Sequence, residues 1–254
     1  MPAAVVLAGG GPEPGLAPDL PNKAFLVIGG RPLVVRVTDA LRKTAAVEPI
    51  LVVGPPAPLA SLLDASFEVI PDQGSMMDNI AAAVDRLSGA AQLLAVASDL
   101  PLITAEAVAG FLRLCTGDAG CYYPIVPQAA IERRFPGARK TYVRVRDGVF
   151  TGCSVLLFDR GLIDRVRPLV EQVIAGRKKP WVIAKLFGWS LALKFSAGTL
   201  SIAEVEERVH EVTGIRAKAV VLDGPELALD IDADRPENHK ILRAALEPDG
   251  RSEG

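Results

Sequence analysis

The sequence contains few of the residues used in covalent catalysis or in disulfides. Its 254 residues include 3 cysteines and 2 histidines. Cys115, Cys121 and Cys153 form an odd set without a CxxC pair, and the first residues lack the basic and apolar regions of a signal peptide. We therefore expect a cytoplasmic protein with reduced thiols.

A cysteine nucleophile is also disfavoured by the sequence. Cys153 lies between apolar segments, and neither His210 nor His239 lies in a segment that resembles an active site. Both histidines fall on predicted helices, so no base is placed beside the thiol. We interpret Cys153 as a buried structural residue.

The chain also lacks a long uninterrupted hydrophobic run and an excess of positive charge. Residues 181–195, "WVIAKLFGWSLALKF", are interrupted by Lys185, Gly188 and Lys194, which excludes a spanning helix there. A net charge of -2 argues against nucleic acid as a general partner. The basic and aromatic stretch 176–201 could lie against a membrane, but we favour a helical hairpin or a homodimer contact.

Short apolar segments alternate with helical patterns in the first half of the chain. Continuously apolar strands between helices predict a doubly wound, mostly parallel α/β sheet, which is a Rossmann-like arrangement. Ser75 and Thr104 are suited to cap the second and third helices. The predicted strands begin near residues 3, 49, 67, 92 and 120, and the predicted helices cover 32–43, 75–87 and 104–114.

The second half departs from this alternation. Residues 141–159 alternate in hydrophobicity, and Asp147-Gly148 predicts a hairpin turn, so we expect an antiparallel ribbon at one side of the sheet. Residues 160–212 are predicted to form a helical insertion within one domain that covers 1–254. Two further strands are predicted at 217–224 and 227–234, followed by a helix over 236–246.

The loop after the first strand is rich in glycine and proline and ends at Lys23. It fails the dinucleotide pattern G-x-G-x-x-G, because Pro14 stands at the third glycine, and Lys23 lacks the G-K-[ST] context of a Walker loop. Glycine backbone and one lysine can hold a phosphate. A mobile surface loop with a solvated lysine is an equally good interpretation of the composition.

Four motifs occur in an order that characterises one family. They are "LAGG" after the first strand, "NKAFLVIGGRPLVVRVTDAL", "ASDLPLIT" after a central strand, and "DIDADRPEN" before the last helix. In these the sequence resembles the molybdenum-cofactor guanylyltransferase type of nucleotidyltransferase, the MobA-like family, which has a GT-A-like fold. The resemblance covers residues 3–126, 152–158 and 227–246.

The resemblance implies that the glycine loop holds a nucleoside triphosphate and that Lys23 contacts its phosphates. The implied nucleotide-binding residues are Leu7, Ala8, Gly9, Gly10, Gly11 and Lys23, with Gly74 and Ser75 near the base or ribose. The family usually carries an arginine in this loop, and this chain has none. Five other cations could replace it, although each is more simply a surface residue: Arg31, Arg133, Arg134, Arg139 and Lys140.

The resemblance also implies a magnesium site. Asp99 matches the family's metal-binding aspartate, and Asp232 or Asp234 matches the acidic residue before the last helix. In a strand, Asp230, Asp232 and Asp234 would share one face and would repel one another without a cation. For Asp99 and Asp234, capping of the following helix is the structural alternative, and Thr104 already suits that role near Asp99.

The function implied is transfer of a nucleoside monophosphate from a nucleoside triphosphate to a phosphorylated acceptor, with Gly152 and Ser154 beside the acceptor. Lys23 and Asp99 are the implied catalytic residues. The base stays open, with GTP among the candidates, and so does the acceptor, with molybdopterin among the candidates. A GT-A glycosyltransferase and a nucleotide-binding protein without catalysis are the alternatives.

Overall fold

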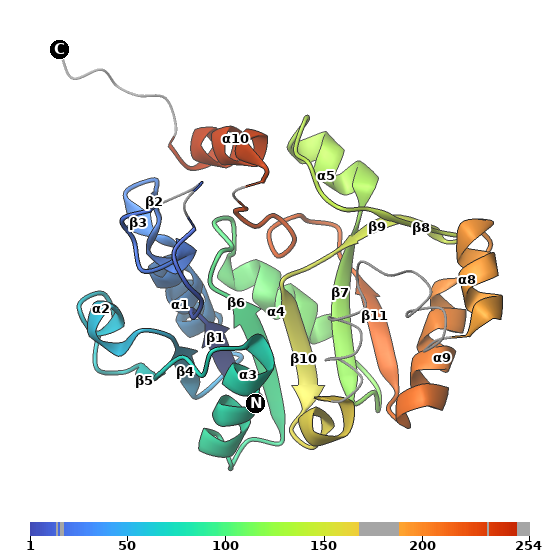
Figure 1. Cartoon of the computed structure of the whole chain (residues 1–254), viewed down its shortest axis with the longest axis horizontal. Coiled ribbons are helices and arrows are strands. Elements are labelled where there is room, and N and C mark those ends of the chain that lie inside the picture. The colour runs from blue at the N-terminus through green and yellow to red at the C-terminus, as the bar shows by residue number, and fades with distance from the viewer. Residues whose placement is uncertain (14, 16–17, 168–187, 233, 248–254) are drawn as a thin grey trace.

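The computed structural model describes residues 1–13, 15, 18–167, 188–232 and 234–247, and these build one large sheet with helices on both faces (Figure 1). In the described part of the chain this sheet has nine strands in the order β5-β4-β1-β6-β10-β7-β9-β8, with β11 also paired to β7. The strands are β1 (Ala3–Leu7), β4 (Ile50–Val53), β5 (Glu68–Ile70), β6 (Gln92–Ala97), β7 (Cys121–Pro127), β8 (Val143–Val145), β9 (Gly148–Gly152), β10 (Val155–Asp159) and β11 (Ala217–Val221). A separate small sheet pairs β2 (Val27–Ile28) with β3 (Arg31–Pro32).

The centre of the sheet confirms the doubly wound, mostly parallel α/β fold. β1 lies between β4 and β6 and pairs in parallel with both. Four of its five residues are buried, because helices cover the sheet on both sides. Parallel strands ending at the same edge place their following loops together, which is the usual ligand edge of such sheets.

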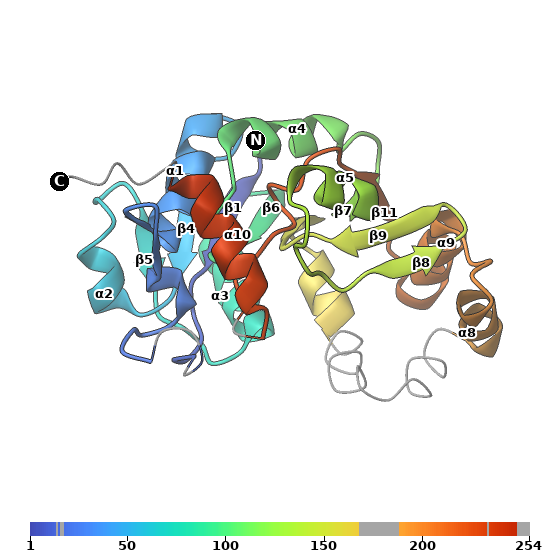
Figure 2. The ribbon, with the colours of Figure 1, turned by 90° about the horizontal axis from the view of Figure 1, so that it is seen from above.

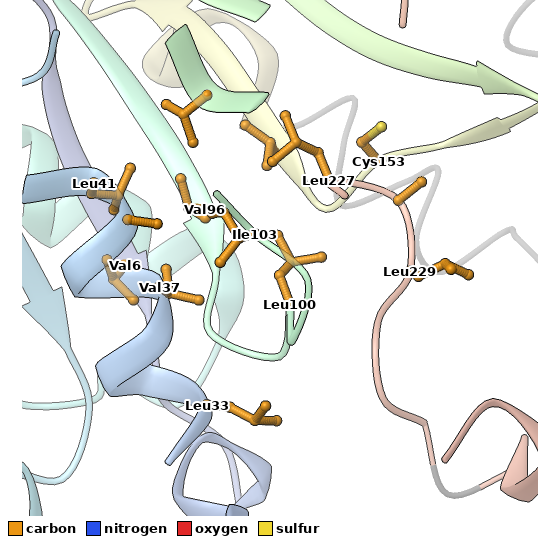
Figure 3. Close-up of a cluster of buried hydrophobic side chains, with 14 of the residues drawn as sticks. Val6, Leu33, Val37, Leu41, Val96, Leu100, Ile103, Cys153, Leu227 and Leu229 are labelled. Carbon is orange, nitrogen blue, oxygen red and sulfur yellow. The ribbon is translucent and has the colours of Figure 1, made fainter. Parts of the chain in front are cut away.

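The helices divide between two apolar layers. α1 and α4 pack on one face and α3 on the other, as the view from above shows (Figure 2). Figure 3 shows the first layer, where Val37 of α1 lies near Val6, and Leu100 lies in the loop after β6. The helices are η1 (Lys23–Phe25, a 3-10 turn), α1 (Leu33–Thr44), α2 (Pro56–Ala60), α3 (Met76–Arg86), α4 (Ala105–Leu114), α5 (Gln128–Arg134), α8 (Trp189–Ser196), α9 (Ile202–Thr213) and α10 (Pro236–Leu246).

Several local predictions are confirmed. Ser75 and Thr104 cap α3 and α4, because each side chain accepts a hydrogen bond from a backbone N–H of the first turn. The antiparallel ribbon is present as β8 and β9. Its turn is one residue earlier than predicted: Val145 pairs with Gly148, so Arg146 and Asp147 form the turn.

Two predictions about the second half were wrong. β10 was expected in an edge ribbon, but it lies inside the sheet, antiparallel to β6 and to β7. Residues 227–234 were expected to form a strand, but the described ones form a turn and an irregular segment. The N–H groups of Ala228 and Leu229 both donate to Pro225 O, so the backbone bonds locally instead of to a neighbouring strand.

The helical insertion predicted over 160–212 lies only partly within the residues that the structure describes. α8 and most of α9 fall within it, while residues 168–187, including much of the basic and aromatic stretch, lie outside the described residues. The single-domain assignment stays a prediction. Within the described ranges, no helix combines the length and the hydrophobicity needed to cross a membrane.

The loop after β1 is closed by one buried amide. The side chain of Asn22 is 2% exposed and caps η1 by accepting a hydrogen bond from the Ala24 N–H. Its Nδ2 group donates to Ala8 O at 2.9 Å and to Gly10 O at 3.2 Å. The amide therefore ties both ends of the loop together and fixes where η1, and with it Lys23, begins.

A carboxylate from a second loop holds the same glycines. Asp72, which follows β5, accepts hydrogen bonds from Gly10 N at 2.6 Å, Gly74 N at 2.9 Å and Asn79 Nδ2 at 2.9 Å. These donors favour the ionised form, so the pKa of Asp72 lies below its ordinary value of 3.8. A Cβ atom at Gly9 would meet this carboxylate at 2.6 Å, so only glycine fits there.

We expect Asn22→Ala to lower the free energy of unfolding by about 2–3 kcal/mol, because buried carbonyl groups lose their donor. Asn22→Asp should cost at least as much, since a carboxylate can still accept from Ala24 N–H but cannot donate to Ala8 O or Gly10 O. Urea unfolding measures both. A loss below about 0.5 kcal/mol, typical of a surface substitution, would contradict this role.

Asp72→Asn should lower the free energy of unfolding at neutral pH by about 1–2 kcal/mol, because an amide cannot accept from all three donors. A carboxylate with a lowered folded pKa stabilises the protein above its unfolded pKa and loses that contribution as pH falls through the folded value. The difference between wild type and variant should thus shrink below pH 3.8. Asp85→Asn, an exposed site on α3, is the control, and a pH-independent difference would exclude the ionised clamp.

Candidate active site

The ammonium group of Lys23 lies among acidic side chains from three distant parts of the sequence. Its Nζ is 2.6 Å from Asp99 Oδ2, 3.4 Å from Asp232 Oδ1 and 3.7 Å from Glu13 Oε1. It also donates to the carbonyl of Ile231 at 3.4 Å. The two residues that the sequence singled out as catalytic, Lys23 and Asp99, are therefore in direct contact.

Backbone pairing brings these segments to one edge of the sheet. Ser98 N donates to Leu7 O, which joins the ends of β6 and β1, and Ile231 N donates to Asp99 O. The irregular segment before α10 is thus fixed alongside the loop after β6. In both overall views α10 lies over the edge where β1 and β6 end (Figures 1 and 2).

The charges at this edge depend strongly on one another. Burial lowers the pKa of Lys23, but attraction and a hydrogen bond from Asp99, with smaller contributions from Asp232 and Glu13, outweigh it and raise the pKa overall. Burial raises the pKa of Asp99; Lys23 opposes that effect, while repulsion from Asp230 and Asp232 adds to it. The pKa of Asp99 is raised overall, because burial and the neighbouring carboxylates outweigh the opposing effect of the Lys23 ammonium group.

Asp99 has the properties of a ligand for a hard cation. Asp99 is 6% exposed, and its Oδ1 atom is buried without a hydrogen-bond partner in the structure. Among the described residues no group of three or more His, Cys, Asp or Glu could hold a metal by itself. Mg²⁺ needs only one or two protein carboxylates when phosphates and water complete its shell, so Asp99 with a neighbouring aspartate fits this ion.

Asp99, Asp230 and Asp232 are called the acidic cluster below. Asp230 was not among the predicted metal ligands. Its Oδ1 atom is 2.7 Å from Lys140 Nζ, and its Oδ2 atom accepts a hydrogen bond from Ser154 Oγ at 3.3 Å. Its charge acts on Asp99, as the raised pKa of Asp99 records. The sequence signal was present in "DIDAD", but the aspartates were expected on a regular strand.

The predicted trio of aspartates on one strand face is not present. Asp232 contacts Lys23 and, through Oδ2, lies 2.9 Å from Arg235 Nη1, whereas Asp234 is exposed. Arg235 N donates to Asp232 O, so the chain turns at this point and the alternation of a strand is lost. The structure thus brings Asp99, Asp230 and Asp232 together and leaves Asp234 at the surface.

Of the five cations considered as replacements for the loop arginine, Lys140 reaches the acidic cluster. Three of the others form ion pairs elsewhere, and Arg133 is exposed. These pairs are Arg31 with Asp39, Arg134 with Glu226, and Arg139 with Glu237. Arg235, which was not considered as a replacement, also lies at the cluster. The surface interpretation was therefore wrong for Lys140.

The predicted nucleotide-binding loops lie side by side. The amide of Gly10 is bonded to Asp72, and the Asp72 carboxylate also bonds Gly74, so residues 9–10 and 72–74 form one connected unit. Ser75 caps α3, with its hydroxyl 3.1 Å from Asp78 N. Leu7 and Ala8 lead into the loop, and Gly11 is exposed. The sequence analysis did not identify Asp72 as a residue that holds the glycine loop, because no motif around residue 72 indicates such a role.

The predicted acceptor residues differ in what they contact. Ser154 donates to Asp230 and so belongs to the cluster. Gly152 packs on Tyr123, where a Cβ atom would meet the phenol oxygen at 2.0 Å, so its glycine has a packing reason. Cys153 between them is buried in the apolar cluster, as predicted (Figure 3), and burial raises its pKa to about 12, which disfavours the thiolate.

A cavity of about 530 Å³ has Ser154 among its lining residues. Its walls are almost entirely apolar, and Leu7 and Ala97 line the end near the strand termini, while Met77 and Ile80 of α3 line one side. Neither Lys23 nor Asp99 contributes to these walls. The charged cluster therefore borders an uncharged space.

Comparison with known proteins identifies the family and the fold. The family model "MobA-like NTP transferase domain" matches residues 4–184. A solved structure described as a hypothetical transferase from Thermus thermophilus is 37% identical, with a TM-score of 0.83, and the alignment covers 93% of this chain and 98% of that one. No curated protein matches the chain in sequence.

More distant solved structures share the fold. A CMP:2-keto-3-deoxy-manno-octonic acid synthetase complexed with CTP is 17% identical, with a TM-score of 0.59 and coverage of 96% and 97%. A 4-diphosphocytidyl-2C-methyl-D-erythritol synthase from Anaerococcus prevotii is 12% identical, with a TM-score of 0.57 and coverage of 96% and 95%. Together with the family match, these likenesses confirm the predicted resemblance: the chain belongs to the MobA-like NTP transferase family of nucleotidyltransferases.

Proposed function

We propose that this protein is a magnesium-dependent enzyme that moves a nucleoside monophosphate from a nucleoside triphosphate to a phosphorylated small-molecule acceptor, with release of pyrophosphate. The observation that supports this most directly is the contact between Lys23 Nζ and the buried carboxylate of Asp99 at 2.6 Å. This contact supports a site in which Lys23, at the end of the glycine loop, would bind phosphate and Asp99, in the loop after β6, would bind the metal ion.

The bond changes follow from the substrates. An oxygen of the acceptor phosphate forms a bond to the α-phosphorus, the bond from this phosphorus to the bridging oxygen breaks, and pyrophosphate leaves. Bound Mg²⁺ would supply charge that reduces repulsion between the two anions. Lys23 would bind the triphosphate, and Asp99 with Asp230 or Asp232 would hold the ion.

No strong general base is required by this chemistry. A phosphate monoester is already anionic near neutral pH, so it can attack without losing a proton to the protein. The described residues around Lys23 accordingly supply charge and position through ammonium, guanidinium and carboxylate groups. Electrostatic stabilisation prepared in advance is commonly the largest contribution in such sites.

The acceptor would bind at the Ser154 side of the cluster, with its uncharged part toward the apolar cavity. GTP with a molybdopterin acceptor, which the resemblance to the molybdenum-cofactor guanylyltransferase type implies, is one possibility, and the related fold solved with CTP adds cytidine nucleotides. The base is therefore best identified by experiment.

A thermal-shift screen of ATP, CTP, GTP and UTP with Mg²⁺ should identify one triphosphate that stabilises the wild type, by about 2.7 kcal/mol at a concentration of 100 times its Kd. Lys23→Met should weaken that triphosphate about tenfold or more, because a charge-assisted contact is lost. Lys43→Met, the same change at an exposed position of α1, should leave the affinity unchanged. Equal affinity in wild type and Lys23→Met would contradict the assignment.

Asp99→Asn should remove the dependence of triphosphate binding on Mg²⁺ while the protein stays folded, since Lys23 keeps Asp232 and Glu13 as neighbours. Titration calorimetry with and without Mg²⁺ measures this. If the variant still gains affinity from Mg²⁺ as the wild type does, Asp99 does not hold the ion.

Product formation separates the remaining alternatives. Release of pyrophosphate from a triphosphate and a phosphorylated acceptor supports nucleotidyl transfer. Turnover of a nucleotide sugar would instead support the GT-A glycosyltransferase alternative, and tight binding without pyrophosphate from any acceptor would support a nucleotide-binding protein.

A further inference from the structure

We propose that Lys140 is the anion-binding residue for the acceptor's phosphate, and that it becomes available when a divalent cation replaces it at Asp230. This inference rests on the proposed function and specifies how its acceptor side works. It concerns a residue outside the four motifs of the family resemblance, in the segment between α5 and β8.

The placement of Lys140 is unusual for a lysine. Its side chain is 7% exposed, and the Asp230 carboxylate, to which it donates at 2.7 Å, is 15% exposed. Lysine is seldom so buried unless it is paired. Its ammonium group donates to Asp230, so a phosphate that takes the place of this carboxylate would find a hydrogen-bond donor already in position.

The charges around Lys23 and Lys140 nearly balance. Lys23, Lys140 and Arg235 are three cations, and the carboxylates paired with them are Glu13, Asp99, Asp230 and Asp232. If a doubly charged ion enters among the carboxylates, the protein's own cations have an excess of positive charge. That excess is what two phosphorylated substrates would neutralise.

The geometry assigns different substrates to the two lysines. Lys23 follows the glycine loop after β1. Lys140 contacts the opposite member of the cluster, whose other oxygen accepts a hydrogen bond from Ser154, next to the apolar cavity. A phosphate that replaces the Asp230 carboxylate would therefore find an ammonium group and a hydroxyl group already converging.

A purely structural ion pair is the competing explanation. In that case Lys140 neutralises Asp230 and nothing else, and its removal affects stability without a specific effect on anions. The two explanations differ in the effect on phosphate, because only the proposal predicts weaker phosphate binding when Lys140 is removed, and this difference makes the test possible.

The test compares wild type, Lys140→Met and Arg139→Gln by titration calorimetry with inorganic phosphate as the probe. Arg139 is the matched control, because it is the adjacent residue, its side chain is 73% exposed and it pairs with Glu237 away from the cluster. Titrations are made in Mg²⁺ with a saturating methylene-bridged analogue of the best triphosphate, so that the Lys23 side is occupied.

We expect Lys140→Met to raise the Kd for phosphate about tenfold or more, as expected for loss of a charge-assisted hydrogen bond. Without phosphate or nucleotide, the same variant should bind Mg²⁺ more tightly than wild type, because Asp230 has lost its competing cation. Arg139→Gln should change neither. An unchanged phosphate Kd in Lys140→Met, or an equal loss in Arg139→Gln, overturns the proposal.

Asp230→Asn provides a second test should Lys140→Met not fold. It weakens the contact that holds Lys140, so phosphate should bind more tightly than in wild type when Mg²⁺ is absent. An unchanged or weaker phosphate affinity overturns the proposal. A failure of the proposed function gives a different result, because wild type would then bind no triphosphate. The effect of Lys140→Met on the Kd for phosphate can still be measured in Mg²⁺ without nucleotide.

Discussion

The ion pair between Lys23 and Asp99 is the interaction on which the organisation of the site depends. Burial and the neighbouring carboxylates raise the pKa of Asp99, and the ammonium group at 2.6 Å opposes that effect at the ligand edge of the sheet. The fold therefore has to hold the Lys23 ammonium group beside Asp99, and contacts of the surrounding loops fix it there.

Two side chains hold the glycine loop that leads to Lys23. Asn22 ties the start and end of the glycine loop, and Asp72 holds its middle from the neighbouring loop. The side-chain hydrogen bonds of both residues go to backbone and amide groups of the loops, and together they determine where η1 begins. On the other side, Ile231 N bonds Asp99 O, which places the acids before α10 beside the end of β6. Bringing these three sequence segments together costs chain entropy, and backbone pairing offsets part of that cost.

The sequence predicted the features that have a local cause. Apolar, β-branched runs gave the parallel strands, and Ser75 and Thr104 predicted the starts of α3 and α4 correctly. Asp99 was found in a motif directly after a strand and Lys23 at the end of the glycine loop that follows the first strand, and the family resemblance implied their roles. Their contact followed from the rule that parallel strands end at a common edge.

The features that the sequence did not predict arise from tertiary contacts. Residues 227–234 have the alternation of a strand, yet Pro225 accepts two local hydrogen bonds and the segment bonds to loops. This altered the acidic cluster, since Asp230 replaced Asp234. Lys140 was considered but dismissed as a surface residue, because its partner lies 90 positions away in the sequence. Asp72 was missed for a similar reason, with Gly10 62 positions distant.

The central claim is that the site exchanges partners when its substrates bind, and a crystal structure with Mg²⁺ and the preferred triphosphate tests it most directly. The account predicts that Lys23 Nζ moves from the Asp99 carboxylate to the triphosphate and that an ion occupies its place beside Asp99. A nucleotide bound elsewhere, with the contact between Lys23 and Asp99 still at 2.6 Å, would contradict it.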